Sequence, residues 1–229
     1  MSGGLGLRLR PYTENDPKSM IKVGKRPIAE WQIQWLRSHD ITHAIFAIGH
    51  RGEKIVEHFA ESNEFGMRIE FSLEQEPLGT AGALKKSASL IAEDTCVVLN
   101  GDVITDLNLR TMIQLHLKLQ TKTTMAVVPY ISSFGIVEVT PTGKVAGFVE
   151  KPRIPNTYIN GGVYVLSRDV IIGLPEKGNL EGTVFPNLAS KGDIGSYLHD
   201  GDWMSIDNVK DVLTAQRKAP EWETKITGN

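Results

Sequence analysis

The run TCVVLNGDVI, residues 95–104, is typical of a buried β-strand that ends in a polar turn. β-Branched and apolar residues favour a strand, and Asn-Gly-Asp marks the point where it stops. Three comparable runs cover residues 42–50, 67–74 and 123–131. Each run adjoins an amphipathic stretch that is long enough for a helix, and these stretches cover residues 27–39, 52–62, 80–91 and 107–120.

The alternation of these runs predicts an α/β fold, in which a mostly parallel sheet is covered by helices on both faces. Ligands of such folds bind beyond the carboxyl ends of the strands. Residues 135–151 alternate around Pro-Thr-Gly and predict a β-hairpin. A further strand is predicted over 158–167, and we expect it and the hairpin to be antiparallel additions to the same sheet. The sequence after residue 167 predicts a helix over about 180–191, a strand pair around 195–207 and a helix over about 209–218. The polar residues that follow are expected to be frayed.

Composition limits the class of protein further. The chain has 229 residues, 41% of them hydrophobic and evenly spread, which favours a single domain over 1–229 with one contiguous core. The formal net charge is −2 with both signs interspersed, so no nucleic-acid partner is expected. The lone Cys96 is interpreted as a small buried hydrophobe in a reducing compartment. Because no apolar run of about 18 residues and no leader pattern is found, we expect a cytoplasmic protein without a membrane partner.

A glycine-rich, basic stretch near the start reads GGLGLRLRPYTENDPK. Gly3, Gly4 and Gly6 lack Cβ atoms and permit positive φ, so their backbone N–H groups can converge on a polyphosphate. Arg8 and Lys18 can supply the opposing charge. The Walker ending and the dinucleotide fingerprint are both missing, and taken alone the stretch is more typical of a flexible tail than of a phosphate loop.

A second candidate is QEPLGTAGAL, residues 75–84, where a loop enters a predicted helix. Gly79 and Gly82 allow close approach of another backbone, and Thr80 can cap the helix. The carboxylate of Glu76 can accept both N–H groups on the edge of a guanine. The alternative is an ordinary capped join between a loop and a helix.

Two further motifs carry charged and polar side chains at strand ends. Asp102 in VVLNGD is placed to bind Mg²⁺ beside a triphosphate, unless it only caps a turn. Glu150 and Lys151 end the predicted strand in GFVEKP. Asn160 and Gly161 lie in the next predicted strand. Carboxylate and amide groups suit sugar hydroxyls and a lysine suits phosphate, although each residue alone is equally typical of a solvated strand end.

Together and in this order, these motifs resemble those of the sugar-1-phosphate nucleotidyltransferases, also called nucleotide-sugar pyrophosphorylases. The family pattern is G-G-x-G-T-R-L-x-P-L-T…P-K-P, then E-P-L-G-T-A-G, N-G-D, E-K-P and N-x-G. The resemblance spans about residues 3–212. It implies a Rossmann-like three-layer αβα fold with a mixed, mostly parallel sheet. EPLGTAGAL with WQIQWL most resembles the mannose- or heptose-1-phosphate guanylyltransferases.

The resemblance also implies an activity and roles for individual residues. A nucleoside triphosphate and a sugar 1-phosphate would react to a nucleotide sugar and pyrophosphate, with GTP and mannose 1-phosphate as the expected pair. Thymidylyl, uridylyl or cytidylyl transfer to glucose 1-phosphate stays open, as do an inactive nucleotide-sugar-binding regulatory subunit and a homo-oligomer. The implied roles are catalysis by Arg8 and Lys18, nucleotide binding by Gly3, Gly4, Gly6, Glu76, Gly79 and Thr80, sugar-phosphate binding by Gly135, Glu150, Lys151, Asn160 and Gly161, and Mg²⁺ binding by Asp102 and Asp207.

The sequence departs from the family pattern inside several motifs. Leu7 stands in place of a Thr, and Arg26 in place of a Lys. Many relatives read W-x-D near the end, where the Asp is a second metal ligand, but here Ser205 holds that position. Asp207 can substitute if the loop shifts, and its alternative role is the N-cap of the helix that begins near residue 209.

The start of the sequence also differs from the family pattern. Relatives have a hydrophobic strand of the type K-A-V-I-L-A directly before Gly-Gly, whereas this sequence has Met1-Ser2 there. We therefore expect the usual first strand to be absent, and three explanations stay open: the start codon lies upstream, another segment fills the position, or the protein is impaired. No hexapeptide repeats follow Val212, so no C-terminal β-helix domain is expected.

Overall fold

The computed structural model describes residues 1, 7–60 and 65–227. β7 and β11 are parallel, and β10 is antiparallel to both β7 and β5, so β10 alone runs against the other three strands of the largest sheet. β3 and β4 form a separate parallel pair. The strands are therefore mixed in direction but mostly parallel, as predicted. The strand order of the largest sheet is β11 (Ile194–Leu198), β7 (Thr123–Ile131), β10 (Arg153–Ser167), β5 (Thr95–Leu99), and the separate pair is β3 (His43–Ile48) and β4 (Arg68–Leu73).

Apart from α5, which was not predicted, the helices of the described residues lie where the sequence predicts them, with shifts at their ends. At the start of α4 the side chain of Asn108 accepts a hydrogen bond from the Thr111 N–H, and Gln120 takes a left-handed conformation after its end. None of the helices in the described residues combines the length and apolar content that a membrane crossing requires. The helices are α1 (Ile28–Ser38), α2 (Glu53–Ala60), α3 (Gly79–Ser87), α4 (Leu109–Leu119), α5 (Arg168–Ile172), α6 (Phe185–Ser190) and α7 (Val209–Thr227).

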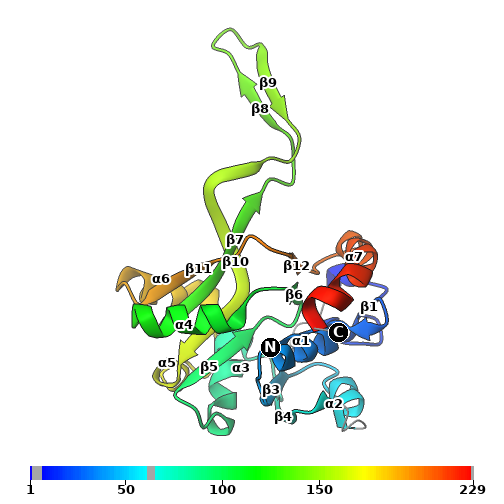
Figure 1. The fold of residues 1–229 in the computed structure, drawn as a ribbon, viewed down its shortest axis with the longest axis vertical. Helices are drawn as coiled ribbons and strands as arrows, with labels where there is room; N and C mark the ends of the chain where they lie inside the picture. The colour runs from blue at the N-terminus through cyan, green and yellow to red at the C-terminus, as the bar shows by residue number, and fades with distance from the viewer. Residues whose placement is uncertain (2–6, 61–64, 228–229) are drawn as a thin grey trace.

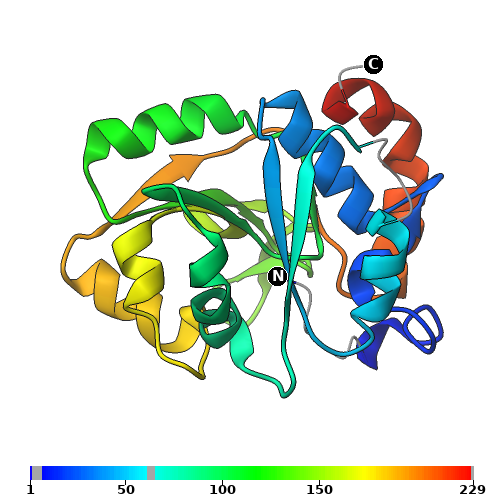
Figure 2. The same cartoon turned by 90° about the horizontal axis from the view of Figure 1, so that it is seen from below.

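Alternate residues of the strands point to opposite faces of the sheet and divide the core in two. Val97 and Leu99 of β5 contact one buried cluster, whereas Cys96 and Val98 contact the other. α1, α4 and α7 cover the first cluster, and α3, α5 and α6 cover the second (Figure 2). Cys96 is partly rather than fully buried, and this burial raises the pKa of its thiol to about 11. The three-layer αβα fold is thus confirmed, but the buried residues form two clusters rather than one contiguous core.

The predicted frayed end is instead a helix. α7 continues to Thr227, and its Trp222 is fully buried with its ring edge-on to Trp31 at 6.3 Å between centroids. Ile226, one turn further, is also buried. The prediction stopped early because Pro220 removes a helical hydrogen bond and favours a helix end. Packing of the residues beyond it outweighs that cost.

Two predictions about the second half of the sheet are wrong. β10 is antiparallel and belongs to the same sheet, as predicted, where it lies between β7 and β5, but the hairpin predicted over 135–151 does not join that sheet. The strand pair expected around 195–207 does not form either. β11 joins β7, whereas β12 (Trp203–Ser205) pairs with β6 (Val103–Thr105). Two short runs around a turn look alike in sequence whether they pair with each other or with separate strands.

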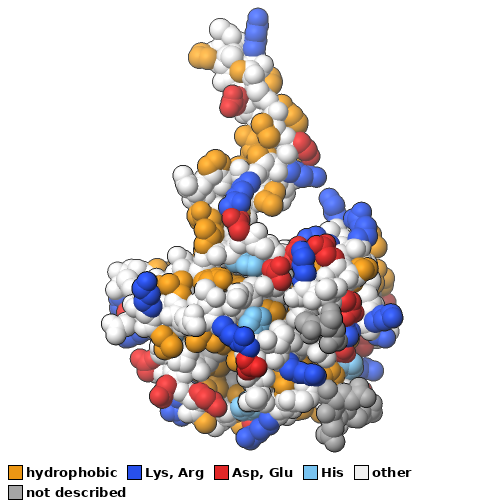
Figure 3. Space-filling model, viewed as in Figure 1, with side chains coloured by type: hydrophobic (Ala, Val, Ile, Leu, Met, Phe, Trp, Pro, Cys, Tyr) orange, Lys and Arg blue, Asp and Glu red, His pale blue; other side chains and the backbone are white. Residues whose placement is uncertain are grey.

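The predicted hairpin forms a sheet of its own. β8 (Ile136–Val139) and β9 (Val145–Val149) pair and project as an arm from the body of the molecule, beyond β7 and β10 (Figure 1). Hydrophobic side chains gather along this arm (Figure 3), and Phe134 and Phe148 are 79% and 63% exposed. A second small hairpin joins β1 (Lys22–Val23) to β2 (Arg26–Pro27).

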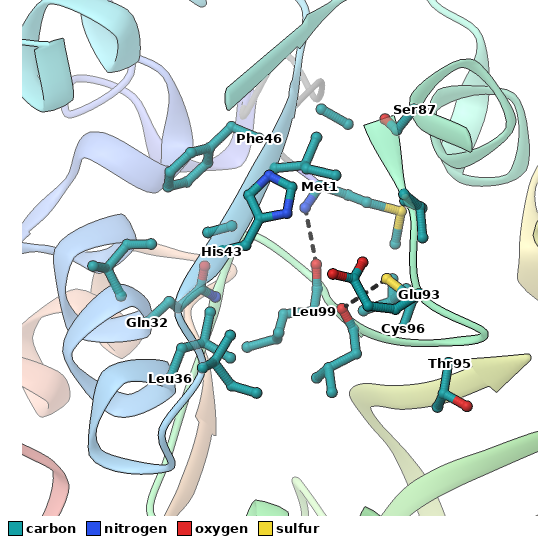
Figure 4. A pocket seen from close by; sticks show the side chains of 18 of the residues that line it. Met1, Gln32, Leu36, His43, Phe46, Ser87, Glu93, Thr95, Cys96 and Leu99 are labelled. Atoms are coloured by element: carbon teal, nitrogen blue, oxygen red, sulfur yellow. Dashed lines mark hydrogen bonds between the residues drawn. The ribbon is translucent and has the colours of Figure 1, made fainter. Parts of the chain in front are cut away.

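An apolar groove separates β3 from β5 (Figure 4). In the described part of the chain no strand lies between them, since β3 pairs with β4 and β5 with β10. The groove has a volume of about 390 Å³ and is lined by both strands, α1 and α3. Met1 also lines the groove, and its amine donates to the Leu99 carbonyl while its carbonyl accepts from the Gly101 N–H, both at 2.9 Å. These two bonds have the pattern of a parallel pairing with the end of β5.

Candidate active site

One lysine and two carboxylates from separate motifs meet near the carboxyl end of β5. Lys18 Nζ lies 2.6 Å from Asp102 Oδ2 and 2.8 Å from Asp207 Oδ1. Asp102 follows β5 and Asp207 follows β12. The pairing of β6 with β12 brings the two aspartates together, and the Ile206 N–H donates to the Asp102 carbonyl at 3.0 Å. The structure therefore places the predicted catalytic lysine and both predicted metal ligands in one group, called here the Lys18 cluster.

The charges of the Lys18 cluster shift the pKa values of its members. Burial acts to lower the pKa of Lys18, but the carboxylates of Asp102 and Asp207 outweigh it and raise that pKa above its usual 10.5. Burial acts to raise the pKa of Asp207, but hydrogen bonds from Lys18 and Ser205 outweigh it and lower that pKa below its usual 3.8. The charge of the exposed Arg8 adds to this lowering. At neutral pH the cluster thus holds an ammonium against an ionised Asp207.

Ser205 orients Asp207. Its hydroxyl donates to Asp207 Oδ2 at 2.7 Å, while Asp207 Oδ1 contacts the lysine. The alternative role of Asp207 as the N-cap of α7 is wrong, because Asn208 takes it. Asn208 Oδ1 accepts from the Asp211 N–H at 3.1 Å, and Asp211 Oδ2 accepts from the Asn208 N–H at 3.0 Å, which is a reciprocal capping box. The Asp207 carboxylate therefore belongs to the Lys18 cluster.

The two carboxylates of the cluster fit a divalent cation such as Mg²⁺. Both contact the same ammonium, so one cation at that place would reach Asp102 and Asp207 together. Mg²⁺ takes one or two carboxylates from a protein and completes its octahedron with phosphate oxygens and water. Residues 7–60 and 65–227 contain no group of three or more His, Cys, Asp or Glu side chains suited to a metal. The cluster therefore suits a metal that arrives with a phosphate.

Asp207→Asn is expected to lower the melting temperature at neutral pH and to lose this effect in acid. Because its pKa is lowered in the folded protein, the Asp207 carboxylate contributes stability above pH 3.8, which is lost as the pH falls through the folded-state pKa. The side chain is 47% exposed, so a Tm difference of only about 1–4 °C is expected at pH 7. Calorimetry from neutral pH to about pH 2 measures this difference. A Tm difference that stays constant over the range would contradict the ion pair.

The predicted nucleotide loop, residues 75–84, is held in place by residues 176–181. The sequence motifs did not single out this second segment. Gly79 has a φ of +75°, and a Cβ there would lie 2.4 Å from the Gly178 carbonyl oxygen. Thr80 Oγ1 donates to Glu181 Oε2 at 2.9 Å and accepts from the Leu180 N–H at 2.8 Å. The Thr80 hydroxyl is thus bonded within the protein, and its contact with a nucleotide stays a prediction.

Glu76 lies beside the same segment. Its carboxylate is exposed and pairs with Lys177 Nζ at 3.1 Å. Sequence reasoning missed Lys177, because its only local signal is the turn sequence Pro-Glu-Lys-Gly-Asn at 175–179, which marks a loop. A contact between residues this far apart in the chain has no local sequence pattern.

Gly82→Ala is expected to destabilise the protein, because the new Cβ would lie 2.4 Å from the Glu176 carbonyl oxygen. Overpacking of this kind costs about 1–3 kcal/mol and lowers the Tm of a chain of this size by about 3–10 °C. The matched control is Gly182→Ala, where nothing lies within 4 Å of the Cβ position and the Tm should change by less than about 2 °C. An unchanged Tm for Gly82→Ala would show that the 176–181 segment does not press on the nucleotide loop.

One part of the predicted sugar-phosphate site lies at the foot of the arm. Glu150 and Lys151 follow β9, are half or more exposed and pair with each other at 3.6 Å. Gly135 belongs with them, because a Cβ there would lie 2.4 Å from Phe148 Cζ and 3.0 Å from Glu150 Oε2. Among the described residues, this group makes no ion pair with the Lys18 cluster.

The other part of the predicted sugar-phosphate site lies next to the Lys18 cluster. Asn160 Nδ2 donates to the Tyr164 hydroxyl at 2.7 Å, and Asn160 Oδ1 accepts from the Gly162 N–H at 2.9 Å. The Gly162 carbonyl accepts from the Asn100 N–H at 2.8 Å, which connects this segment to the turn that carries Asp102. The Gly161 carbonyl accepts from the tryptophan of β12 at 2.7 Å. The backbone here is thus fixed between β5 and β12.

The structure describes only part of the glycine-rich stretch near the start of the chain. Gly3, Gly4 and Gly6 lie outside the described residues, so their phosphate contacts stay predictions. Arg8 lies in a short 3₁₀ helix, Leu7–Leu9, and is exposed. Lys18, the last residue of this stretch, contacts Asp102 and Asp207 directly, and the charge of Arg8 contributes to the lowered pKa of Asp207.

The fold and the Lys18 cluster together define an α/β protein that holds a lysine between two carboxylates near the ends of its strands. Residues 1–221 match the family described as nucleotidyl transferase. The chain belongs to this family, as its motifs predict.

The relatives cover more than one base and sugar. The mannose-1-phosphate guanyltransferase of Aspergillus fumigatus is 34% identical over 221 residues, which cover 93% of this chain and 61% of that protein. The UTP–glucose-1-phosphate uridylyltransferase of Synechocystis is 32% identical over 246 residues, which cover 98% of this chain and 63% of that protein. The chain thus spans less than two thirds of the length of these relatives.

Solved structures share the fold. HddC from Yersinia pseudotuberculosis, complexed with GMP-PN, has a TM-score of 0.77 and 25% identity, covering 95% of this chain and 96% of that one. Apo UDP-glucose pyrophosphorylase has a TM-score of 0.74 and 16% identity, covering 97% of both chains. The predicted α/β nucleotidyltransferase fold is confirmed by these likenesses.

Proposed function

We propose that the chain transfers a nucleotidyl group from a nucleoside triphosphate to a sugar 1-phosphate and releases pyrophosphate. The observation that carries the proposal is the position of Lys18 between Asp102 and Asp207. A cation set between two carboxylates near the end of a sheet strand suits a triphosphate that brings its own metal. GTP and mannose 1-phosphate are the proposed substrates, because mannose-1-phosphate guanyltransferases are among the relatives at 34% identity.

The reaction needs no nucleophile from the protein. A phosphate oxygen of the sugar 1-phosphate attacks the α-phosphorus of the triphosphate in line, and pyrophosphate leaves with the electron pair of the broken P–O bond. The residues must bring two anions together and offset their repulsion. Asp102 and Asp207 would hold Mg²⁺, which when bound supplies positive charge to the phosphate oxygens. Lys18 would then direct its ammonium to the phosphates instead of the carboxylates.

Residues around the cluster would bind the rest of the two substrates. Arg8 is close enough to act on Asp207 and would contact the triphosphate. Asn160 and Gly161, next to the cluster, would face the sugar. Glu150 and Lys151 would close over the sugar phosphate from the foot of the arm, which requires the arm to approach the Lys18 cluster.

The nucleotide loop would receive the base and ribose. Glu76 has an exposed carboxylate that can accept the N–H groups of a guanine, and Gly79 with Thr80 lies directly after it in the loop. Uridylyl transfer to glucose 1-phosphate is the second candidate, because the uridylyltransferase of Synechocystis matches 98% of this chain.

A substrate panel tests the proposal. Purified protein with Mg²⁺ is given each of GTP, UTP, dTTP and CTP with mannose 1-phosphate or glucose 1-phosphate, and pyrophosphate release is measured. The proposal expects release to be fastest with GTP and mannose 1-phosphate. Fastest release with UTP and glucose 1-phosphate would favour the second candidate. Nucleotide binding without release for every pair would favour a regulatory subunit.

A further inference from the structure

The segment 176–181 fixes the geometry of the nucleotide loop from one side. The Gly178 N–H donates to the Leu78 carbonyl at 2.8 Å, and the Gly178 carbonyl accepts from the Ala81 N–H at 2.9 Å. Asn179 Oδ1 accepts from the Thr80 N–H at 3.2 Å. These three hydrogen bonds hold the two segments together. The backbone positions from which the neighbouring side chains extend are therefore fixed.

The side chains of Glu76 and Lys177 extend from these two segments next to each other. Lys177 Nζ lies 3.1 Å from Glu76 Oε2, and the two side chains are 65% and 67% exposed. The remaining lone pairs and N–H groups therefore face solvent and are open to a ligand. An isolated exposed pair of this kind adds little to folding, so its chemistry toward a ligand is of more interest than its stability.

The loop that carries Glu76 and the turn that carries Asp102 both adjoin the groove between β3 and β5. α3, which follows the loop in the chain, lines this groove through Leu84 and Ser87. Met1 lines it as well, and its carbonyl accepts from the Gly101 N–H at 2.9 Å, directly before Asp102. A nucleotide with its phosphates at the Lys18 cluster can direct its base toward Glu76 and Lys177.

The pair offers an acceptor and a donor side by side, which is a pattern that selects among bases. Guanine presents the O6 acceptor beside the N1–H and N2–H donors, so the ammonium can meet O6 while the carboxylate accepts from both N–H groups. Adenine presents an N6 amino donor where guanine has O6 and an N1 acceptor where guanine has N1–H. Adenine would therefore place a donor against the ammonium and an acceptor against the carboxylate.

We propose that Lys177 is a specificity-determining residue that binds the guanine O6, with Glu76 accepting the neighbouring N–H groups. The inference rests on the proposed function, because it assigns the base-binding part of the same site. It makes the site selective for purines with an oxygen at position 6 over purines with an amino group there.

Equilibrium binding of GTP and ATP in the presence of Mg²⁺ tests this role without requiring turnover. The wild type should prefer GTP, and Lys177→Met should reduce the GTP-to-ATP ratio of affinities by about 10-fold or more, because it removes the donor to O6. Lys177→Arg keeps a donor and should retain most of the preference. Lys191→Met removes another exposed lysine and should leave the ratio unchanged.

6-Thio-GTP separates this role from a general loss of charge. Its sulfur is a weak acceptor in place of O6, while both N–H groups remain. The wild type should bind it more weakly than GTP, whereas Lys177→Met should bind both alike. An unchanged GTP-to-ATP ratio in Lys177→Met would overturn the role of Lys177 and leave nucleotidyl transfer standing. Selective nucleotide binding without pyrophosphate release would instead overturn the transfer, and no nucleotide binding at all would overturn both.

Discussion

Asp102→Asn is expected to reduce the rate of pyrophosphate release by about 10²-fold or more, by analogy with the loss of one preorganised charged group. Asparagine keeps the shape of the side chain but removes the negative charge that would hold the metal and that now faces Lys18 at 2.6 Å. Steady-state kinetics at saturating substrates measure the effect on kcat.

The matched control for this substitution is Asp40→Asn. Asp40 is exposed, pairs with Arg110 and precedes β3, so it lies at the opposite end of that strand from the carboxyl ends. Its turnover should equal that of the wild type. Because Asp102→Asn changes a partly exposed side chain, its Tm is measured as well. A stable variant with full turnover would remove Asp102 from the site.

Lys18→Ala is expected to reduce kcat by a similar factor, about 10²-fold or more, because the phosphates lose a preorganised positive charge. The same substitution removes the cation that contacts both carboxylates, so it should strengthen the binding of Mg²⁺ or Mn²⁺ by the protein without nucleotide. Calorimetric titration with the metal alone measures this second effect. The two effects have opposite signs, which a general loss of folding would not produce.

Lys22→Ala is the control for Lys18→Ala. Lys22 is exposed on β1, four residues further along, and its side chain is not part of the Lys18 cluster. Its turnover and metal binding should match the wild type. Lys18→Ala with normal turnover would show that the lysine only balances the two aspartates and does not act on the phosphates.

The order of strands and helices in the first half could be predicted from sequence, because its elements alternate with clear periods. Lys18 and Asp102 of the Lys18 cluster could also be predicted, since both lie in motifs that the family resemblance covers. Ser205 and Asp207 were harder, because a serine in the expected place of an aspartate does not reveal that its hydroxyl would orient the next carboxylate.

The features that could not be predicted depend on contacts between segments that lie far apart in the chain. β11 and β12 are short runs on either side of a turn, and only the sheet decides that one joins β7 and the other β6. Pro220 is a local sign of a helix end, whereas the burial of Trp222 that continues the helix depends on a contact with Trp31 in α1. The contact between Glu76 and Lys177 is of the same kind, since it joins two loops that local patterns treat separately.

The most direct test of the central claim is the measurement of Mg²⁺-dependent pyrophosphate release from GTP and mannose 1-phosphate by the wild type, with Asp102→Asn beside it. The account predicts that the wild type releases one pyrophosphate for each GDP-mannose formed and that the variant is slower by about 10²-fold or more. Binding of GTP with no pyrophosphate release by the wild type, for this pair and for UTP with glucose 1-phosphate, would contradict it.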